Sequence, residues 1–456
     1  MKPLSNRIKV SKILHVIVVF IAISGSSLAA MKTYYIDALN GKDSNSGQSS
    51  STAFKTIKKA VDLLMPGDIC AVQKGNYPER VNISRSGMVD NYITIRAVET
   101  GVTTRGFTIE ASFIRIEGFE ITGTDAKSWK NGAGIHIRGK NCVIINNYIH
   151  NVYLEGIRLG DDLTSSSTSN CLIKSNKMVR CGQAGIQICG QNNIVENNEI
   201  TGTIQWAKTN PQNLDADGMR FFGSGHIIRM NYIHDILLSD PENSASPHID
   251  CIQTWGPATN IIFEQNNFSL GESKKNKQIA MITEVASPVR DITFRNNFFH
   301  DTFRGLNIYG SHVAGHPSPI NNVSILNNTF VNFFDNAFEL HDCPESYVLN
   351  NIFYNSTSIF IDSITSSSSG KLTIGYNCYF RAAGKKVDGI NPGKTDLWNV
   401  NPGFVNASKG NYNLKNNSPL IGRGKIIPGV KNDFIGRYRN SNKAYDIGAF
   451  GHLKNK

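Results

Sequence analysis

Closely spaced cysteine pairs are missing from this sequence. No Cys-x-x-Cys spacing occurs, so nothing suggests a structural zinc site built on cysteine pairs. The eight cysteines are scattered along 456 residues and do not form the dense framework of a small disulfide-stabilised domain. Two of them, Cys142 and Cys171, hold equivalent places in consecutive repeats. We expect these two to stack as small core residues, with a disulfide possible but not required.

Apolar runs of membrane length are missing as well. The run from Ile13 to Ile23 is too short to span a bilayer, and no other stretch approaches that length. Positive residues precede the run and small residues follow it, which is the pattern of a cleaved signal peptide. We therefore expect residues 1–29 to be removed and residues 30–456 to be secreted or periplasmic, without a membrane anchor.

Negative charge is in the minority. The formal net charge is +11, and four positive residues precede the expected cleavage site, so about +7 would remain on the exported chain. Outside the cell, a basic surface meets acidic polysaccharide more often than nucleic acid. We expect a polysaccharide partner, anionic in character, and no nucleic acid. A solvated basic surface without a partner is the alternative.

What the sequence does contain is an internal repeat built around asparagine. One phrase occurs eight times, as in Ile144-Ile145-Asn146-Asn147-Tyr148-Ile149: an apolar residue, two variable residues, Asn, a variable residue and another apolar or Met residue. The intervals counted from Asn147 are 29, 22, 33, 35, 31, 31 and 23 residues. A fixed phrase at variable spacing indicates a constant core with loops of different length between the repeats. The later asparagines are Asn176, Asn198, Asn231, Asn266, Asn297, Asn328 and Asn351.

This repeat predicts an all-β, single-stranded right-handed parallel β-helix, a solenoid of about ten coils. Helical repeats are excluded because no segment within the repeats sustains a 3.6-residue period. Asparagine tolerates the left-handed conformation that a bend between short strands needs. We therefore expect the repeated asparagines to occupy the bends and to hydrogen-bond to one another from coil to coil.

The two ends depart from the repeat. Residues 53–65 place Phe54, Ile57, Val61 and Leu64 on one helical face, which predicts an amphipathic helix that covers the open N-terminal end of the solenoid. The main coils are expected over residues 92–357. Residues 358–456 should hold the last coils and an irregular C-terminal cap. We expect one domain over residues 30–456, acting as a monomer.

A second phrase precedes the asparagine phrase in most repeats: a small residue, then apolar, variable, apolar, as in Gly218-Met219-Arg220-Phe221. Because the coils of a parallel β-helix stack about 4.8 Å apart, equivalent positions form columns. The outward position carries His136, Arg158, Gln187, Arg220, Gln253 and Asn307. The position before the small residue carries Ala133, Glu155, Ala184, Asp217, Asp250, Arg304 and Asn336.

These columns bring carboxylates together on two neighbouring coils. Asp215, Asp217 and Asp250 should lie within one or two coil spacings of one another, with Arg220 and His248 beside them. The alternative is a ladder of turn-forming Asp residues satisfied by backbone amides. Like charges this close raise one another's pKa or require a cation, which is uncommon in a purely structural turn. We therefore take the group as the candidate catalytic centre.

Two long insertions, residues 204–214 and 237–247, enter the same coils and could wall a cleft. Trp206 and Trp255 are candidate platforms for sugar rings, although Trp255 could equally be a packed coil-end residue. Arg158 and Gln253 are further candidates for binding the substrate. Arg304, farther along the column, is a candidate catalytic cation.

At this point the sequence resembles the pectate-lyase-like superfamily of right-handed β-helix, carbohydrate-active enzymes. The segments that carry the resemblance are YYIDALNGKDSNSGQ, AFKTIKKAVDLLMPGD, NSPLIGRG and DIGAFG, together with the repeats. In its polygalacturonase-type hydrolases, catalytic Asp residues precede Gly and Cys, as Asp217-Gly218 and Asp250-Cys251 do. The position before Asp250 departs from that pattern, because it holds Ile249 instead of another Asp.

In the calcium-dependent lyases of the superfamily, acidic residues hold Ca²⁺ while a Lys or Arg removes a proton next to a uronate carboxylate. The resemblance implies a calcium site at Asp215, Asp217 and Asp250. A lysine on a following coil has no counterpart here, because Thr283 and Asn307 stand at the outward positions. Arg220, Arg304 or the lysines of residues 274–277 would have to act as the base.

The basic charge and the arginines of the outward face favour a lyase that cleaves an acidic polysaccharide by β-elimination. The alternative is a glycoside hydrolase in which Asp215, Asp217 and Asp250 serve as acid and base. A third possibility, from a different class of protein, is a β-helix that binds glycans without turning them over.

Overall fold

The computed structural model describes residues 30–124, 131–164, 166–206, 215–243, 247–271, 277–283, 288–310, 320–362, 372–382, 391 and 393–452. The expected signal peptide, residues 1–29, lies outside them. Lys32–Lys456 forms one unit. No helix among the described residues is long and apolar enough to cross a membrane.

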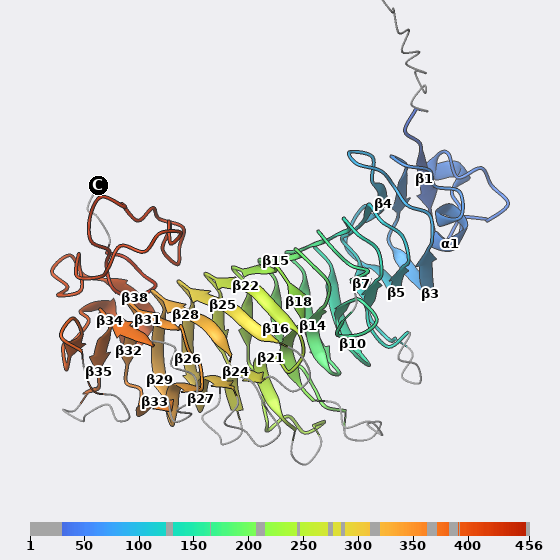
Figure 1. Cartoon of the computed structure of the whole chain (residues 1–456). Helices are drawn as coiled ribbons and strands as arrows, with labels where there is room; N and C mark the ends of the chain where they lie inside the picture. The colour runs from blue at the N-terminus through green and yellow to red at the C-terminus, as the bar shows by residue number, and fades with distance from the viewer. Residues whose placement is uncertain are drawn as a thin grey trace, which may run out of the picture. The chain divides into compact units, whose positions relative to one another are not determined.

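Short parallel strands stack in three ladders, and most coils contribute one strand to each (Figure 1). Ladder one comes first in a coil, and its strands pair only with equivalents in the coils before and after. Its members are β1 Thr33–Ile36, β2 Ile69–Val72, β4 Ile93–Ala97, β6 Ile114–Glu117, β9 Val143–Ile145, β12 Leu172–Lys174, β15 Ile194–Glu196, β19 Ile227–Arg229, β22 Ala258–Glu264, β25 Val289–Arg295, β28 Asn321–Leu326, β31 Tyr347–Leu349 and β34 Thr373–Gly375, with β18 Gly223–Ser224 paired to β22.

Ladder two follows the asparagine bend in most coils. It contains β7 Glu120–Ile121, β10 Tyr148–Val152, β13 Lys177–Cys181, β16 Glu199–Thr201, β20 Tyr232–His234, β23 Asn267–Ser269, β26 Phe298–Thr302, β29 Thr329–Phe333, β32 Ile352–Tyr354, β35 Cys378–Phe380 and β36 Leu397–Trp398. Two long strands, β3 Gly75–Ile83 and β5 Val102–Ile109, precede the split, and β5 pairs with the first strands of both ladders two and three.

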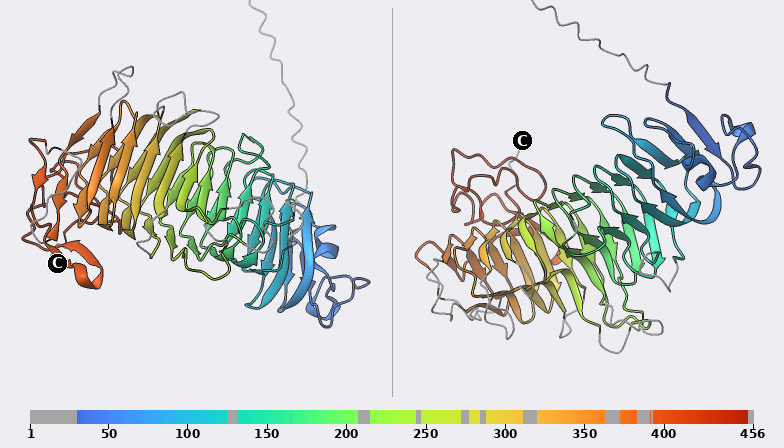
Figure 2. Two further views of the ribbon diagram at one scale, coloured as in Figure 1. Left: turned by 90° about the horizontal axis from the view of Figure 1, so that it is seen from below. Right: turned by 45° about the vertical axis from the view of Figure 1, so that its right-hand side comes forward.

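Ladder three closes each coil and carries the second sequence phrase. It contains β8 Ile135–Ile137, β11 Ile157–Leu159, β14 Ala184–Ile188, β17 Asp217–Phe221, β21 Ile249–Thr254, β24 Lys277–Thr283, β27 Arg304–Tyr309, β30 Asn336–His341 and β33 Ser358–Asp362. In Figure 1 its members β21, β24, β27 and β33 follow one another along one side of the coils, and Figure 2 shows the stacked strands from two further directions. Alternate side chains of all three ladders point inward and form one apolar core that runs along the coils.

The expected asparagine ladder is present between ladders one and two. The side-chain oxygen of Asn176 accepts bonds from the backbone N–H (3.0 Å) and the side-chain amide (2.9 Å) of Asn147, and the pattern repeats from coil to coil. The prediction that the ladder asparagines themselves adopt the left-handed conformation is wrong. It falls on the residue directly before each ladder asparagine, such as Asn146 (φ 57°) or Met230 (φ 54°). The ladder asparagine therefore contributes through its side-chain amide group, which makes the hydrogen bonds from coil to coil.

The N-terminal helix is shorter than predicted. Only Ile57–Val61 is helical (α1), instead of residues 53–65. The Thr56 side chain accepts a bond from the Lys59 amide and begins the helix, and the chain turns at Pro66-Gly67 soon after its end. The predicted apolar face is nevertheless buried, since Phe54, Ile57, Val61 and Leu64 all lie in the core. Short 3-10 turns occur at Ser50–Thr52 and Ala407–Lys409.

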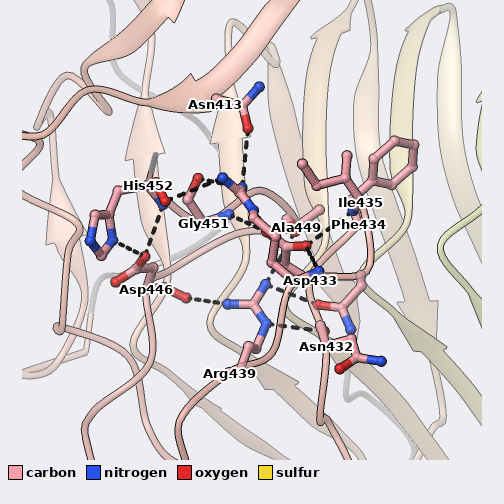
Figure 3. Close-up of polar contacts among 12 residues, drawn as sticks. Asn413, Asn432, Asp433, Phe434, Ile435, Arg439, Asp446, Ala449, Gly451 and His452 are labelled. Carbon is pink, nitrogen blue, oxygen red and sulfur yellow. Dashed lines mark hydrogen bonds and ion pairs between the residues drawn. The ribbon is translucent and has the colours of Figure 1, made fainter. Parts of the chain in front are cut away.

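After ladder two ends, the antiparallel pair β37 Phe404–Asn406 and β38 Asn411–Leu414 begins an irregular segment that returns along the outside of the coils. Arg439 anchors it by donating to the side-chain oxygen of Asn296 (3.0 Å) and to the carbonyls of Asp446, Gly448 and Ala449. Figure 3 shows this guanidinium pointing into a set of polar groups that also includes the Asp446–His452 pair. The segment buries a second apolar cluster against ladder two.

Cys142 and Cys171 stack as expected. All eight cysteines are buried and none forms a disulfide. The backbone N–H of Cys142 lies 3.5 Å from the Cys171 sulfur.

Candidate functional site

Ladder three lines up its outward side chains in one column. His136, Arg158, Gln187, Arg220 and Gln253 are directly in register on successive strands, as the sequence predicts. The next position is Met281, so the expectation of Thr283 was wrong. Asn307 and then Glu339 continue the column. Thr283 pairs with Tyr309 instead.

A second column, formed by the position just before the small residue of each phrase, contains the paired carboxylates. Asp217 is the first residue of β17 and Asp250 the second residue of β21, and the backbone N–H of Asp250 donates to the side chain of Asp217 (3.2 Å). Gly218 follows Asp217 because the coils approach closely there: a Cβ would lie 2.5 Å from the Cys251 carbonyl oxygen. Stacking of identical strand starts thus brings two carboxylates onto adjacent coils.

A buried arginine holds one of the carboxylates. The Nε of Arg220 donates to Asp217 (2.6 Å), and one terminal nitrogen donates to Asp215 (3.0 Å). The Arg220 side chain is 5% exposed and Asp217 is fully buried, whereas Asp215 is 29% exposed. The guanidinium also lies over the Trp255 ring, 5.1 Å from its centroid. Arg220 is therefore an ion-paired structural cation, unsuited to removing a proton.

The carboxylate of Asp250 has fewer hydrogen-bond partners than that of Asp217. Its side chain is fully buried, and among the described residues no donor makes a well-aligned hydrogen bond to either carboxylate oxygen. The Nδ1 of His248 lies 3.2 Å from one of these oxygens, and the Gln278 amide occupies the next coil in register. His248 is 40% exposed. In this cluster of Asp217, His248 and Asp250, the histidine is the member most open to a ligand.

Burial raises the pKa of both carboxyl groups. The pKa of Asp217 rises to about 6, because burial and the charge of Asp215 outweigh the opposing effect of Arg220. Burial and the charge of Asp217 raise the pKa of Asp250 well above its ordinary range, with Arg220 and the Gln278 amide acting in the opposite direction. The pair therefore holds a proton more tightly than two isolated carboxylates would.

The implied calcium site is only partly present. Asp217, His248 and Asp250 each offer one ligand atom within 4.8 Å of the others, which makes them a possible metal-binding group. Asp215 is not in that group and faces Arg220 instead. Calcium takes roughly six to eight oxygen ligands. Two carboxylates, one imidazole nitrogen and an adjacent guanidinium do not fit it, whereas transition metals accept such mixed donors.

The remaining predicted residues are spread along the ladder. Arg158 pairs with the buried Glu155 (3.0 Å). Arg304 is 41% exposed and pairs with Asp335 (2.8 Å). It stands two coils from Asp250, through Gln278.

Gln253 is nearly buried and lies beside His248, with its Nε2 3.5 Å from Nδ1. Trp255 packs between Arg220 and Phe222. Trp206 is half-buried. The Nζ of Lys277 is buried and donates to the Ile236 carbonyl, while Lys274 and Lys275 lie outside the described residues.

One polar group on this face was missed. It is centred on the carboxylate of Glu339, which contacts the side chains of Tyr309, Asn336 and His341. Glu339 occupies the same outward position as Arg220 and Gln253, so the register of the second phrase could have found it.

The comparisons with known proteins concern the fold. Residues 34–182 match the family model described as "Pel9A-like, right handed beta helix region". The matched residues end before Asp215, so they do not include the site. The structure also superimposes on that of the pectate lyase Pel9A, with a TM-score of 0.52 and 16% identity over 94% of this chain and 98% of the other. The fold is a right-handed parallel β-helix.

Two further β-helix structures are similar. A complex of XylC with xylose gives a TM-score of 0.61 at 12% identity, over 93% of this chain and 99% of that one. The GH136 lacto-N-biosidase from Eubacterium ramulus gives 0.54 at 13% identity, over 77% and 68%. No curated protein matches the chain. The predicted resemblance to right-handed β-helix carbohydrate-active enzymes is confirmed at the level of the fold.

Proposed function

We propose that this β-helix is a secreted enzyme that cleaves an acidic, uronate-containing polysaccharide by β-elimination, with His248 as the proton-transferring group. The observation that carries the proposal is the exposure of His248 beside a buried carboxylate pair. Asp217 and Asp250 are fully buried, so neither reaches a sugar in this conformation, whereas His248 is 40% exposed. A solvent-facing histidine backed by a carboxylate is a recurrent acid–base arrangement.

The position of Asp250 favours a different role for each imidazole nitrogen of His248. Nδ1 faces Asp250, so Nε2 is left for the substrate. In its ionised form, Asp250 keeps a proton on Nδ1 and orients the ring, and Nε2 takes the proton next to the uronate carboxylate. Asp250 then stabilises the imidazolium, while Arg220 neutralises Asp217 behind it. As the carbon–carbon double bond forms, the bond from the ring to the leaving sugar oxygen breaks, and the imidazolium gives its Nε2 proton to that oxygen. A carboxyl group with a raised pKa is, once ionised, a strong acceptor for the Nδ1 proton.

The substrate carboxylate needs a positive partner. Arg304 is an exposed cation on the same ladder, and its present partner Asp335 is 36% exposed, so the pair can be exchanged for a uronate without burying a charge. We assign Arg304 to this role and not to proton removal, because a guanidinium keeps its proton in proteins. The net positive charge of the chain supports an anionic substrate.

A hydrolase is the second candidate, and the raised pKa of Asp250 favours it. A carboxyl group whose pKa is raised is what a glycosidase uses to protonate the leaving oxygen. This candidate requires Asp217 and Asp250 to become exposed when sugar binds. It predicts activity on the acidic side of neutrality, whereas the lyase predicts activity that rises with pH as Asp250 ionises.

The test is ultraviolet absorbance of the mature protein, residues 30–456, with a panel of galacturonate, guluronate, mannuronate and glucuronate polymers, each with added calcium and with chelator. We expect absorbance from a new unsaturated sugar that His248→Ala abolishes and that calcium chelation leaves in place. New reducing ends without that absorbance would favour the hydrolase. Loss on chelation that calcium restores would contradict the assignment of His248 and return the cluster to metal binding. Binding without any product would leave a glycan-binding β-helix.

A further inference from the structure

A second cluster lies on ladder three, three coils beyond Asp250. Its centre is Glu339, whose carboxylate accepts hydrogen bonds from the Tyr309 hydroxyl (2.9 Å) and the Asn336 amide (3.2 Å) and pairs with His341 Nε2 (2.8 Å). The Tyr309 and His341 rings stack, with centroids 4.7 Å apart. These four residues, the Glu339 cluster, come from the adjacent strands β27 and β30.

The Glu339 cluster shares a face with the His248 site. Glu339 continues the outward column that contains Arg220 and Gln253. At about 4.8 Å a coil, the strand that holds Glu339 lies roughly 14 Å from the strand that holds Asp250. Polar side chains lie on the coils between the two: Gln278 is in register with Asp250, and the amide of Asn307, which is in register with Glu339, donates to the Gln278 oxygen. This separation is too large for both groups to act on one glycosidic bond, where roughly 5–9.5 Å is needed.

Two buried oxygens beside Glu339 lack a donor. The side-chain oxygens of Asn307 and Asn336 accept no hydrogen bond from any described residue, although their residues are 0% and 6% exposed. Buried acceptors are normally paired, so each marks a position where a donor is missing. Glu339 itself is 17% exposed, which leaves its carboxylate within reach of a ligand. Acceptors without donors beside a reachable carboxylate are suited to the hydroxyl groups of a sugar.

The charge of the cluster selects among sugars. Glu339 and the nearby Asp335 are acidic, and the proposed function assigns Arg304, which pairs with Asp335, to the uronate at the cleavage centre. A uronate carboxylate placed against Glu339 would meet a like charge. An uncharged sugar has only hydroxyls to offer, and the half-buried Tyr309 ring, stacked on His341, lies beside Glu339.

We propose that the Glu339 cluster is a subsite for an uncharged sugar unit, about three coils from the cleavage centre. The ligand class rests on the proposed function, since it takes the protein to act on polysaccharide. The subsite implies a substrate in which neutral units accompany uronate units. Glu339 accepts hydrogen bonds from the sugar hydroxyls, and the buried side-chain oxygens of Asn307 and Asn336 take part only where sugar binding exposes them.

Calorimetric binding to the His248→Ala protein, in which the proposed turnover is strongly slowed, tests this proposal. The probes are xylo-, manno- and cello-oligosaccharides of two to six units, beside oligogalacturonates of the same lengths. We expect at least one neutral series to bind, and Glu339→Gln to weaken that binding about tenfold or more. Tyr309→Phe, which keeps the ring and removes one donor to Glu339, should weaken it less. Glu120→Gln is the matched control, because Glu120 pairs with His150 on ladder two.

The outcomes separate this inference from the proposed function. Elimination activity without binding of any neutral series, or with binding unchanged in both Glu339→Gln and Tyr309→Phe, overturns the subsite and leaves the lyase. Binding that depends on Glu339 in a protein without elimination activity supports the subsite and overturns the lyase. A thermal melt of each variant shows that it is folded; if Glu339→Gln unfolds, Tyr309→Phe carries the comparison.

Discussion

Two stacks of buried polar side chains run along this solenoid, and they differ in how completely they are paired. In the asparagine ladder, each side-chain oxygen accepts two bonds from the preceding coil and each amide donates to a carbonyl, as at Asn231. In the column of Asp217 and Asp250, one carboxylate is ion-paired and the other accepts no well-aligned bond from the described residues.

The difference separates structure from function on one scaffold. A fully paired buried stack stabilises the coil, because every polar group recovers the hydrogen bond that it gave up to water. An incompletely paired stack lowers stability, so its presence calls for another reason. The same contrast appears at Asn307 and Asn336, which are buried like the ladder asparagines but have acceptors left over.

The largest expected effect is on activity at the unpaired stack. His248→Ala removes the exposed proton-transferring group, so we expect elimination to fall about 10²–10⁴-fold. Stability should change little, because the side chain is 40% exposed. The measurement pairs initial rates with urea unfolding. A variant that is destabilised by several kcal/mol while its rate per folded molecule stays normal would mean that His248 belongs with the structural residues.

The converse variant removes one rung of the paired stack. Asn231→Ala deletes an amide that donates to Val195 and Asn266, and it leaves the backbone and amide donors of Asn198 without their acceptor. We expect unfolding to become easier by about 3 kcal/mol, measured as a shift of the urea midpoint. Asn267→Ala, on ladder two outside the asparagine ladder, is the control. Equal shifts in the two variants would remove the distinction between the stacks.

Much of this contrast is visible in the sequence. The spacing of asparagines predicts the ladder, and the positions of Asp217 and Asp250 before small residues predict that they stack. The register failed at β24 because that coil exchanges the sizes of two positions: Ile279 stands where other coils have a small residue, and Ala280 where they have a large one. The pattern of small and apolar residues was therefore ambiguous there.

Side-chain direction was harder to predict than strand position. Asp215 and His248 both lie two residues before a column carboxylate, yet Asp215 faces Arg220 while His248 faces Asp250. The choice depends on the competing partners of each group, which no spacing encodes. Burial was also underestimated, since a strand start appears exposed in sequence while both carboxylates have no exposed surface.

A smaller effect concerns the pH dependence of stability. Both carboxyls have folded-state pKa values above those of the unfolded chain, with Asp217 at about 6. Their contribution is therefore most favourable below roughly pH 4 and is lost as the pH rises through the folded-state values. Asp250→Asn removes one of the two charges, so it should stabilise the protein by about 1–2 kcal/mol at pH 8 and much less at pH 4. Thermal melts across this range measure the difference; equal stabilisation at both pH values would mean that charge is not its cause.

The smallest effect should come from the exposed cation. Arg304→Gln removes a surface ion pair that contributes about 0–1 kcal/mol, so stability should hardly change. Under the lyase proposal, however, the same side chain receives the uronate carboxylate, so KM for an acidic polymer should rise several-fold while kcat stays near its normal value. Added salt should weaken wild-type binding toward that of the variant, because the contact is exposed and screened.

Arg229→Gln, which breaks a pair with Glu196 on ladder one, controls for the loss of one positive charge. If both variants raise KM equally, the overall positive charge attracts the substrate and Arg304 has no special position; if only Arg304→Gln does, the outward column of ladder three is the surface on which the polysaccharide lies.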